Sequence, residues 1–129
     1  MWDDFAQYIL SEAGDDEVMI AEVAVGRFDR IANYLASKDN ITLIKTDIAP
    51  KDETVIKDDV TNPNLDLYRD VDIIYSIRPP SELQPYLARL ACEIGSQLII
   101  KPLTNEDLNT GKAKMKLKNF KRASFYTLR

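Results

Sequence analysis

The sequence contains no histidine and a single cysteine, Cys92. Without histidine, Ser-His-Asp triads and histidine-ligated zinc sites are excluded, and we expect no metal site. Any proton transfer would have to use Asp, Glu, Lys, Tyr or the cysteine. One cysteine cannot form a disulfide within the chain, which fits a reducing compartment such as the cytoplasm.

Long apolar runs are also missing. No stretch approaches the ~18 consecutive apolar residues that a membrane-spanning helix needs, so we expect no membrane partner. The N-terminus, with Asp3 and Asp4, is acidic where a secretory signal peptide is basic. An apolar content of 45% and a charged content of 29% are typical of globular proteins. We therefore expect one cytoplasmic domain over residues 1–129.

Acidic residues are absent from the C-terminal segment. The net charge is −4, but the segment from Thr110 to Arg129 holds seven of the 17 basic residues and none of the 21 acidic ones. Such a segment can bind nucleic acid, and RNA is the partner that this interpretation predicts. The alternation of its lysines is equally typical of one solvated strand face. The residues concerned are Lys112, Lys114, Lys116, Lys118, Lys121 and Arg122, followed by Arg129.

Glycine is scarce, and each of the four glycines falls between elements that apolar periodicity predicts. The predicted helices cover residues 2–13, 27–35 and 81–94, with a helical turn at 64–68. The predicted strands cover residues 18–25, 41–46, 54–57, 72–77 and 97–101, with two more inside 114–128. Because strands and helices alternate, the sequence predicts a Rossmann-like α/β domain with a mostly parallel sheet.

Four loops follow the strands of this predicted sheet, at residues 22–28, 47–48, 58–60 and 76–81. In open α/β sheets, ligands bind beyond the carboxyl ends of the strands. Because these ends share one edge, we expect the four loops to converge on a single binding site.

The first three loops carry residues that suit a nucleoside. Gly26 lets a ligand approach the backbone, and the helix start after it suits an anion. Asp47 follows Gly26 by 21 residues, the separation at which an acidic residue binds ribose hydroxyls, and Ile48 could pack on a base. Asp58 or Asp59 could accept a hydrogen bond from an exocyclic amine. Each residue also has a structural interpretation, as a turn glycine, a loop carboxylate or a helix cap.

The fourth loop belongs to the stretch "SIRPPSEL", residues 76–83, in which an arginine and two prolines follow a strand. Pro79 and Pro80 stiffen the backbone, so Arg78 would be held rigidly at the ligand edge, where a guanidinium suits a carboxylate or phosphate. Tyr75, Ser76 and Arg78 are the candidate catalytic residues. The alternative is a structural turn with a capping box that starts the next helix.

Several of these motifs together resemble class I S-adenosylmethionine-dependent methyltransferases. "EVAVG" (residues 22–26) resembles that family's first motif, and residues 47–48 fall where its ribose-binding acid and adenine-packing residue lie. "DDV" (residues 58–60) resembles its adenine-edge motif, and residues 76–81 occupy the position of its methyl-acceptor motif. The resemblance spans about residues 16–129. It implies a three-layer sandwich whose sheet ends in an antiparallel hairpin, and S-adenosylmethionine as cofactor. The implied cofactor-binding residues are Glu22, Gly26, Asp47, Ile48, Asp58 and Asp59.

The run "DLYRDVDIIYSIRPPSEL" (residues 66–83) resembles more closely a family of short uncharacterised archaeal proteins, a likeness that implies fold and source without an activity. The chain departs from the methyltransferase pattern at three positions. Ala24 and Phe28 stand where the first motif has glycines, and they could crowd the methionine end of the cofactor. Arg78 stands where a polar residue would precede the two prolines.

The leading hypothesis is a methyltransferase-like domain that binds S-adenosylmethionine or a related nucleoside cofactor. The alternative is a non-catalytic interaction module that kept the fold and binds RNA or a protein through the basic C-terminal segment. A nicotinamide-dependent enzyme is disfavoured, because one glycine stands in place of a three-glycine fingerprint. Cys92 is expected in the core. Glu22, if it does not bind a cofactor, is expected to be satisfied by backbone groups.

Overall fold

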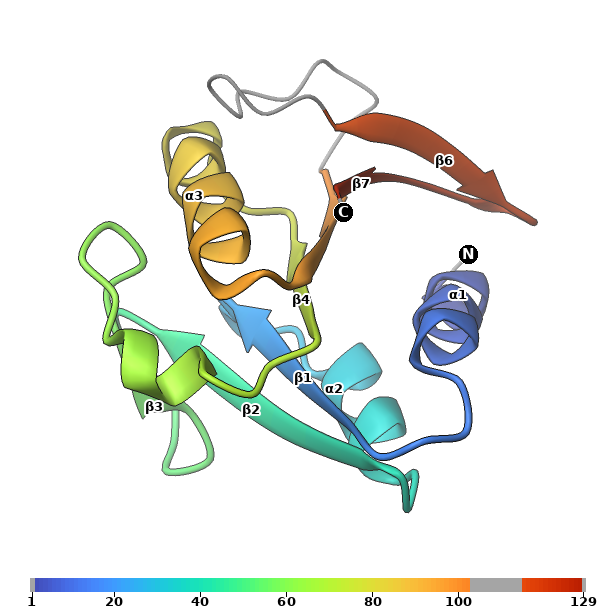
Figure 1. Ribbon diagram of the computed structural model, residues 1–129, viewed down its shortest axis with the longest axis horizontal. Coiled ribbons are helices and arrows are strands. Elements are labelled where there is room, and N and C mark those ends of the chain that lie inside the picture. The colour runs from blue at the N-terminus through green and yellow to red at the C-terminus, as the bar shows by residue number, and fades with distance from the viewer. Residues whose placement is uncertain (1, 103–114, 129) are drawn as a thin grey trace.

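The structure is a computed structural model that describes residues 2–102 and 115–128. Helices and strands alternate along these ranges (Figure 1). The helices are α1 (Trp2–Ala13), α2 (Arg30–Ala36) and α3 (Gln84–Ile94), with 3₁₀ turns at Leu65–Tyr68 and Ser81–Leu83. The strands are β1 (Val18–Val23), β2 (Ile41–Asp47), β3 (Ile56–Lys57), β4 (Ile73–Ile77), β5 (Gln97–Lys101), β6 (Lys116–Phe120) and β7 (Ala123–Leu128).

The strands form one sheet in the order β3-β2-β1-β4-β5-β7-β6. The first five strands of the chain pair in parallel, and β7 runs antiparallel to both β5 and β6. The predicted fold class is therefore confirmed: a Rossmann-like α/β domain with a mostly parallel sheet that ends in an antiparallel hairpin.

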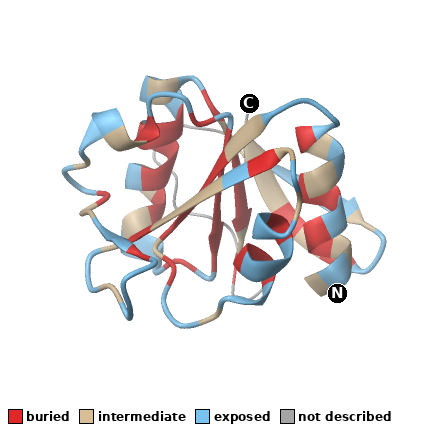
Figure 2. Cartoon of the chain, turned by 90° about the horizontal axis from the view of Figure 1, so that it is seen from below, coloured by how far each residue is buried: buried red, intermediate tan, exposed pale blue. Residues whose placement is uncertain are grey.

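Helices cover both faces of the sheet, which gives three layers (Figures 1 and 2). On one face, Phe5 and Ile9 of α1 and Leu35 of α2 pack on Tyr75 of β4 and Phe125 of β7. On the other face, α3 and the 3₁₀ turn at residues 65–68 pack on Ile74 of β4 and neighbouring strand residues. Successive strand residues point to opposite faces, so a strand covered on both faces buries its side chains on either face. All five residues of β4 are buried for this reason.

The ends of several elements differ from the prediction. β1 ends at Val23, two residues early, because Ala24 adopts a left-handed conformation with φ +59° that extended backbone does not allow. Residues 26–29 form a loop, so α2 begins at Arg30. The predicted helix 81–94 divides into a 3₁₀ turn and α3, with Pro85 in the first turn of α3, where a proline is tolerated.

Cys92 is exposed, so its predicted place in the core is wrong. Leu87, Leu90 and Ala91 of α3 are buried against the sheet. A helix turns by about 100° per residue, so the position after Ala91 already points away from that face. The apolar neighbours of Cys92 in the sequence therefore did not determine its burial.

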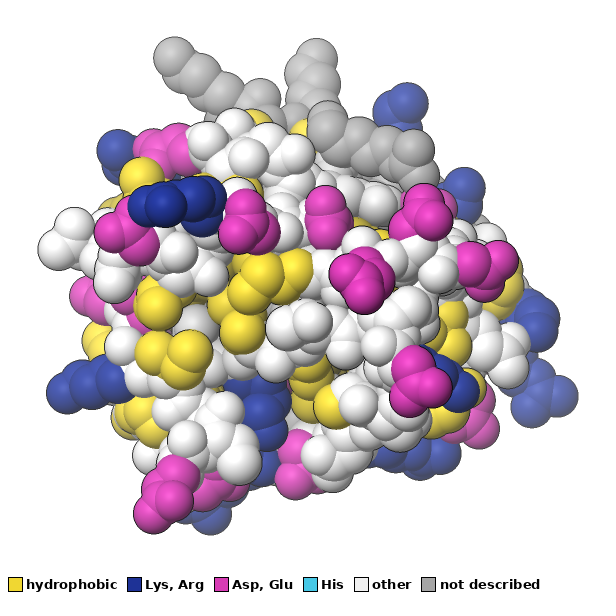
Figure 3. Space-filling model, turned by 60° about the horizontal axis from the view of Figure 1, so that its bottom comes forward, with side chains coloured by type: hydrophobic (Ala, Val, Ile, Leu, Met, Phe, Trp, Pro, Cys, Tyr) yellow, Lys and Arg dark blue, Asp and Glu magenta, His cyan; other side chains and the backbone are white. Residues whose placement is uncertain are grey.

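The described part of the chain contains no helix that is long and apolar enough to cross a membrane. On the face drawn in Figure 3, acidic and basic side chains are interspersed with hydrophobic ones, without a large area of a single charge.

Candidate functional site

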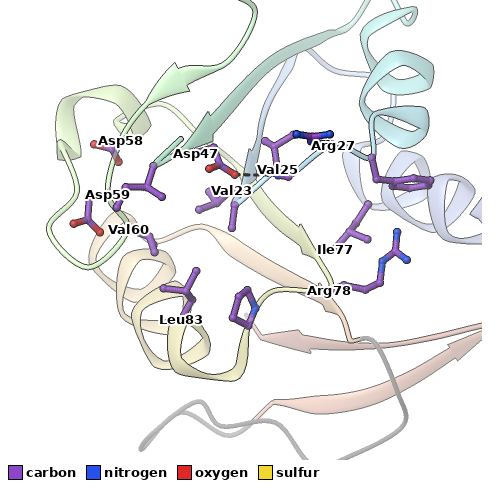
Figure 4. Close-up of a pocket in the computed structure, with 15 residues that line it drawn as sticks. Val23, Val25, Arg27, Asp47, Asp58, Asp59, Val60, Ile77, Arg78 and Leu83 are labelled. Carbon is purple, nitrogen blue, oxygen red and sulfur yellow. Dashed lines mark hydrogen bonds between the residues drawn. The ribbon is translucent and has the colours of Figure 1, made fainter. Parts of the chain in front are cut away.

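A cavity of about 720 Å³ opens at the carboxyl edge of the parallel strands (Figure 4). It is lined by residues 23–28 at the end of β1, Asp47 and Ile48 after β2, and residues 58–60 after β3. The wall is completed by Ile77, Arg78, Pro80 and Leu83 at the end of β4 and beyond it. The four loops that the sequence assigns to one edge thus line the same cavity. Its volume lies in the ~300–1,000 Å³ range of small-molecule sites.

Asp47 connects the loops after β1 and β2. Its Oδ2 accepts a hydrogen bond from the backbone N–H of Gly26, and its Oδ1 accepts one from the backbone N–H of Ala49, both at 2.9 Å. Gly26 has φ +61°, a conformation that favours glycine. Each carboxylate oxygen has a second lone pair, so the fixed carboxylate can still accept hydrogen bonds from a ligand.

Asp58 and Asp59 line the cavity and also hold their own loop. Asp58 Oδ1 accepts from the backbone N–H of Asn64 at 3.0 Å, and its Oδ2 accepts from the hydroxyl of Tyr68 at 2.8 Å. Asp59 Oδ1 accepts from the hydroxyl of Thr61 at 2.7 Å and from its backbone N–H at 2.9 Å. These two bonds lower the pKa of the Asp59 carboxyl. Both residues therefore act as loop carboxylates that hold their own turn, and both also line the cavity.

Apolar side chains lie beside these carboxylates. Ile48 is 60% exposed, whereas Val60 is buried. Both line the cavity, together with Val23 and Leu83. An exposed branched side chain at a cavity rim is a surface on which a flat ring can pack, because burial of apolar area is favourable.

Arg78 lies at the other end of the cavity from Asp58 and Asp59 (Figure 4). Its φ is +53°, and its backbone N–H donates to the carbonyl of Lys101 at 2.6 Å. Its Cζ lies 5.5 Å from the ring centroid of Trp2 and 5.2 Å from that of Phe28. Both distances are within the ~6 Å range of cation–π contacts. The predicted rigid presentation of the guanidinium thus has a second source, contacts with two aromatic rings.

The other two candidate catalytic residues are enclosed within the sheet. Tyr75 and Ser76 are fully buried and do not line the cavity. The Tyr75 hydroxyl donates to Glu22 Oε1 at 2.6 Å, and the Ser76 hydroxyl donates to the carbonyl of Val23 at 2.7 Å. Residues inside a parallel strand point to the helical layers, and only the strand's end reaches the edge.

Glu22 is buried beneath the cavity loops. Its Oε1 is bonded to Tyr75, and its Oε2 has no hydrogen-bond partner among the described residues. The expectation that backbone groups satisfy it is therefore wrong. Burial raises the pKa of this carboxyl from 4.5 to about 7, although the hydrogen bond from Tyr75 and the charges of Lys45 and Lys51 act in the opposite direction.

Ala24 and Phe28, which the sequence suggested could crowd a ligand, both line the cavity. Phe28 packs on Trp2, with ring centroids 4.7 Å apart. Trp2, the first residue of α1, was not among the predicted site residues. Arg27 belongs to the predicted loop 22–28 and lines the cavity, but no role of its own was predicted for it from the sequence.

The basic C-terminal residues that the structure describes lie outside the cavity. Lys112 and Lys114 are outside the described residues. Lys116 and Lys118 are exposed on β6, at the edge of the sheet. Lys121 donates to Gln7 at 2.6 Å, and the backbone N–H of Arg122 donates to Asp4 at 3.1 Å, so the turn contacts α1. None of the four described residues lines the cavity. Within the described ranges, no three His, Cys, Asp or Glu side chains form a potential metal site.

The sheet order and the covering helices define this chain as an α/β domain of the class I methyltransferase type. It is similar to the crystal structure of a SAM-dependent methyltransferase from Aquifex aeolicus, with a TM-score of 0.64 and 12% identity over 95% of this chain and 87% of that chain. It is also similar to the antibiotic-resistance methyltransferase Kmr, with a TM-score of 0.59 and 9% identity over 95% of this chain and 91% of that chain. At these identities the likeness shows the fold.

The chain belongs to the Uncharacterised protein family (UPF0146), whose sequence profile matches residues 2–129. The UPF0146 protein of Methanothermobacter thermautotrophicus is 43% identical over 126 residues, which cover 98% of this chain and 93% of that protein. The UPF0146 protein of Methanocaldococcus jannaschii is 41% identical over 116 residues, 83% of this chain and 80% of that protein. That of Archaeoglobus fulgidus is 34% identical over 114 residues, 85% of this chain and 83% of that protein. The resemblance to short archaeal proteins is therefore confirmed.

Proposed function

We propose that this protein binds an adenosyl cofactor of the S-adenosylmethionine type in the cavity at the carboxyl edge of its sheet. The observation that carries the proposal is the convergence of four separate loops on one cavity, with Asp47 fixed between two of them. The similarity in fold to two methyltransferases supports it.

The nucleoside half of such a cofactor matches the acidic end of the cavity. The carboxylate of Asp47 keeps one lone pair free on each oxygen, so it can accept from the two hydroxyls of a ribose. The base would pack on Ile48, whose exposed surface would then be buried. Asp58 or Asp59 would accept from an exocyclic amine of the base, through the lone pairs that their loop contacts leave free.

The remaining part of the cofactor would extend along Gly26, which would leave the Arg78 end of the cavity for the molecule that accepts the methyl group. When bound, the cofactor supplies an electrophilic methyl group on a sulfonium sulfur. Transfer of such a group depends mainly on alignment, so the lack of histidine is no obstacle. Of the three candidate catalytic residues this proposal retains Arg78, because the hydroxyls of Tyr75 and Ser76 are bonded inside the sheet.

The test is a calorimetric titration with S-adenosylmethionine, S-adenosylhomocysteine and NAD. We expect saturable binding of the two sulfur-containing adenosyl ligands and none of NAD. Ile48→Ala should weaken binding about fivefold, since about 1 kcal/mol of apolar burial is lost. Leu117→Ala is the matched control: Leu117 is 56% exposed on β6, outside the cavity, and its truncation should leave affinity unchanged.

Asp47→Asn provides a second variant, which keeps one acceptor oxygen and removes the charge. We expect about tenfold weaker binding of both adenosyl ligands, the scale of one charge-assisted hydrogen bond. Absence of binding by the wild-type protein at millimolar ligand would refute the proposal. An unchanged affinity in both Ile48→Ala and Asp47→Asn would place the ligand elsewhere.

The alternative, an RNA-binding module, has one observation in its favour. Lys116 and Lys118 are exposed on the edge strand β6, two residues apart and therefore on the same face. The two functions use separate surfaces, because neither lysine lines the cavity. RNA binding that survives Asp47→Asn and is lost when the lysines are neutralised would support this alternative.

A further inference from the structure

The basic end of the cavity carries a feature that cofactor binding alone does not explain. Arg78 lines this end, and Arg27 lines the cavity near Val25 (Figure 4). The ion pairs within the described residues join Arg30, Lys51, Arg69 and Arg89 to carboxylates, and neither cavity arginine takes part in one. Lys101 lies beside Arg78: burial, and then the charge of Arg78, lower the pKa of the Lys101 ammonium group. Arg78 and Lys101 thus place two positive charges at this end, and neither forms an ion pair with a carboxylate of the described residues.

The guanidinium of Arg78 is held in place from two directions. Its backbone is fixed by the hydrogen bond to Lys101 and by the two prolines that follow. Its charged group rests near the rings of Trp2 and Phe28, which come from the first helix and the loop after β1. Three segments distant in sequence therefore orient one cation. A preorganised guanidinium loses less entropy when it binds a carboxylate or phosphate.

Backbone strain is concentrated at the same site. Among the described residues other than glycine, three have positive φ, and two of these, Ala24 and Arg78, line the cavity. A left-handed conformation costs a residue with a β-carbon about 1–2 kcal/mol, a cost that a glycine would avoid. Strained backbone of this kind is concentrated at ligand-binding sites, so the strain at Arg78 supports a ligand contact for its side chain.

We propose that Arg78, in the cavity that Arg27 also lines, binds a carboxylate or phosphate group of a second ligand. This inference rests on the proposed function in one respect: if the cavity binds S-adenosylmethionine, the second ligand is the molecule that accepts the methyl group. The acceptor class is then a small anionic molecule.

The amino-acid end of the cofactor is a poorer match for this subsite. That end carries an ammonium as well as a carboxylate, and the sulfonium adds another positive charge. The carboxylates that line the cavity are Asp47, Asp58 and Asp59, and Figure 4 shows Asp58 and Asp59 at the opposite end from Arg78. The positive charge at the Arg78 end repels an ammonium and attracts a simple anion.

The test titrates isotopically labelled protein with inorganic phosphate and with acetate, at constant ionic strength maintained by chloride, and follows the amide NMR signals. We expect saturable shifts at residues 27 and 77–78. Arg78→Gln should weaken phosphate binding about tenfold or more, the scale of a charge-assisted hydrogen bond, and Arg78→Lys should weaken it less. Arg69→Gln removes the same charge from an exposed arginine outside the cavity and should change nothing. Thermal unfolding of each variant would verify that it is folded.

A second series of titrations tests whether the anion that Arg78 binds belongs to the cofactor or to a second ligand. S-adenosylhomocysteine and 5′-methylthioadenosine share the nucleoside, but the latter lacks the amino-acid end. We expect Arg78→Gln to leave both affinities unchanged and phosphate to bind in the presence of either ligand. If the variant weakens only S-adenosylhomocysteine, Arg78 binds the cofactor and the inference is wrong. Shifts that chloride reproduces, or that survive Arg78→Gln, would also overturn it. Failure of both adenosyl ligands to bind would instead refute the proposed function, while the phosphate titration would still decide whether the subsite exists.

Discussion

Replacing Glu22 by glutamine should remove a large part of the pH dependence of this protein's stability. Glu22 is 1% exposed, one of its oxygens is bonded to Tyr75, and its pKa is raised by burial to about 7. Below about pH 4.5 the carboxyl is protonated in the folded and unfolded states alike. Between about pH 4.5 and 7 the unfolded chain releases this proton and the folded chain keeps it, so stability falls as the pH rises.

The size of the effect follows from the same values. The difference between 4.5 and about 7 corresponds to a loss of about 3 kcal/mol in the free energy of unfolding, complete somewhat above pH 7. Glu22→Gln places a neutral amide of the same shape in this position. An unpaired amide donor costs about 1–3 kcal/mol, but this cost is the same at every pH. It therefore cancels when the variant and the wild type are compared at two pH values.

The assay is urea unfolding of both proteins at about pH 5 and about pH 8. The stability of Glu22→Gln relative to the wild type should improve by about 2–3 kcal/mol from the lower to the higher pH. Glu17→Gln is the control, because Glu17 is exposed in the loop before β1 and the substitution exchanges the same two groups outside the core. A change below about 1 kcal/mol for Glu22→Gln would show that burial does not govern the protonation of this carboxyl.

Three further predictions concern other features of the structure. Tyr75→Phe removes the hydrogen bond that lowers the pKa of the buried carboxyl, so we expect a steeper fall in stability between about pH 5 and pH 8 in urea unfolding. Ala24→Gly relieves a left-handed backbone and should raise the unfolding free energy by about 0.5 kcal/mol, the strain relieved less the chain entropy of glycine. Ala88→Gly, inside α3, should lower it by about 1 kcal/mol, and the same sign for both would contradict this account. Neutralising Lys116 and Lys118 together should reduce retention on an RNA column at low salt if that surface binds RNA. Retention that does not change, or that is insensitive to salt, would count against an RNA surface.

The edge at which the cavity lies could be predicted because parallel strands impose it. Once 18–25, 41–46 and 72–77 read as strands of one parallel sheet, their carboxyl ends had to meet, whatever the details of packing. Asp47 and Ile48 could be placed in the cavity wall from sequence for the same reason. The boundaries were less predictable, since Ala24 leaves the strand through a backbone conformation that no residue pattern announces.

The roles of individual side chains were harder to predict. Ser76 directly precedes Ile77, which ends β4 and lines the cavity, yet the Ser76 hydroxyl is bonded to a neighbouring strand. Whether a polar side chain near a strand end faces the edge or a helical layer depends on the register of that strand. Asp58 likewise could be assigned to a loop, but its bonds to Asn64 and Tyr68 require a 3₁₀ turn packed beneath it.

The sequence by itself determined the fold class and the composition of the cavity's loops, because both follow from local periodicity and from the rules of parallel sheets. The tertiary structure alone decided which charges are compensated. It brings Trp2, Phe28 and Arg78 together across 76 positions of the chain, and it buries Glu22 against Tyr75. Such contacts join residues that share no local pattern. They arise because α1 and the β1 loop pack on the same side of β4, and packing geometry of that kind exists only in the folded chain.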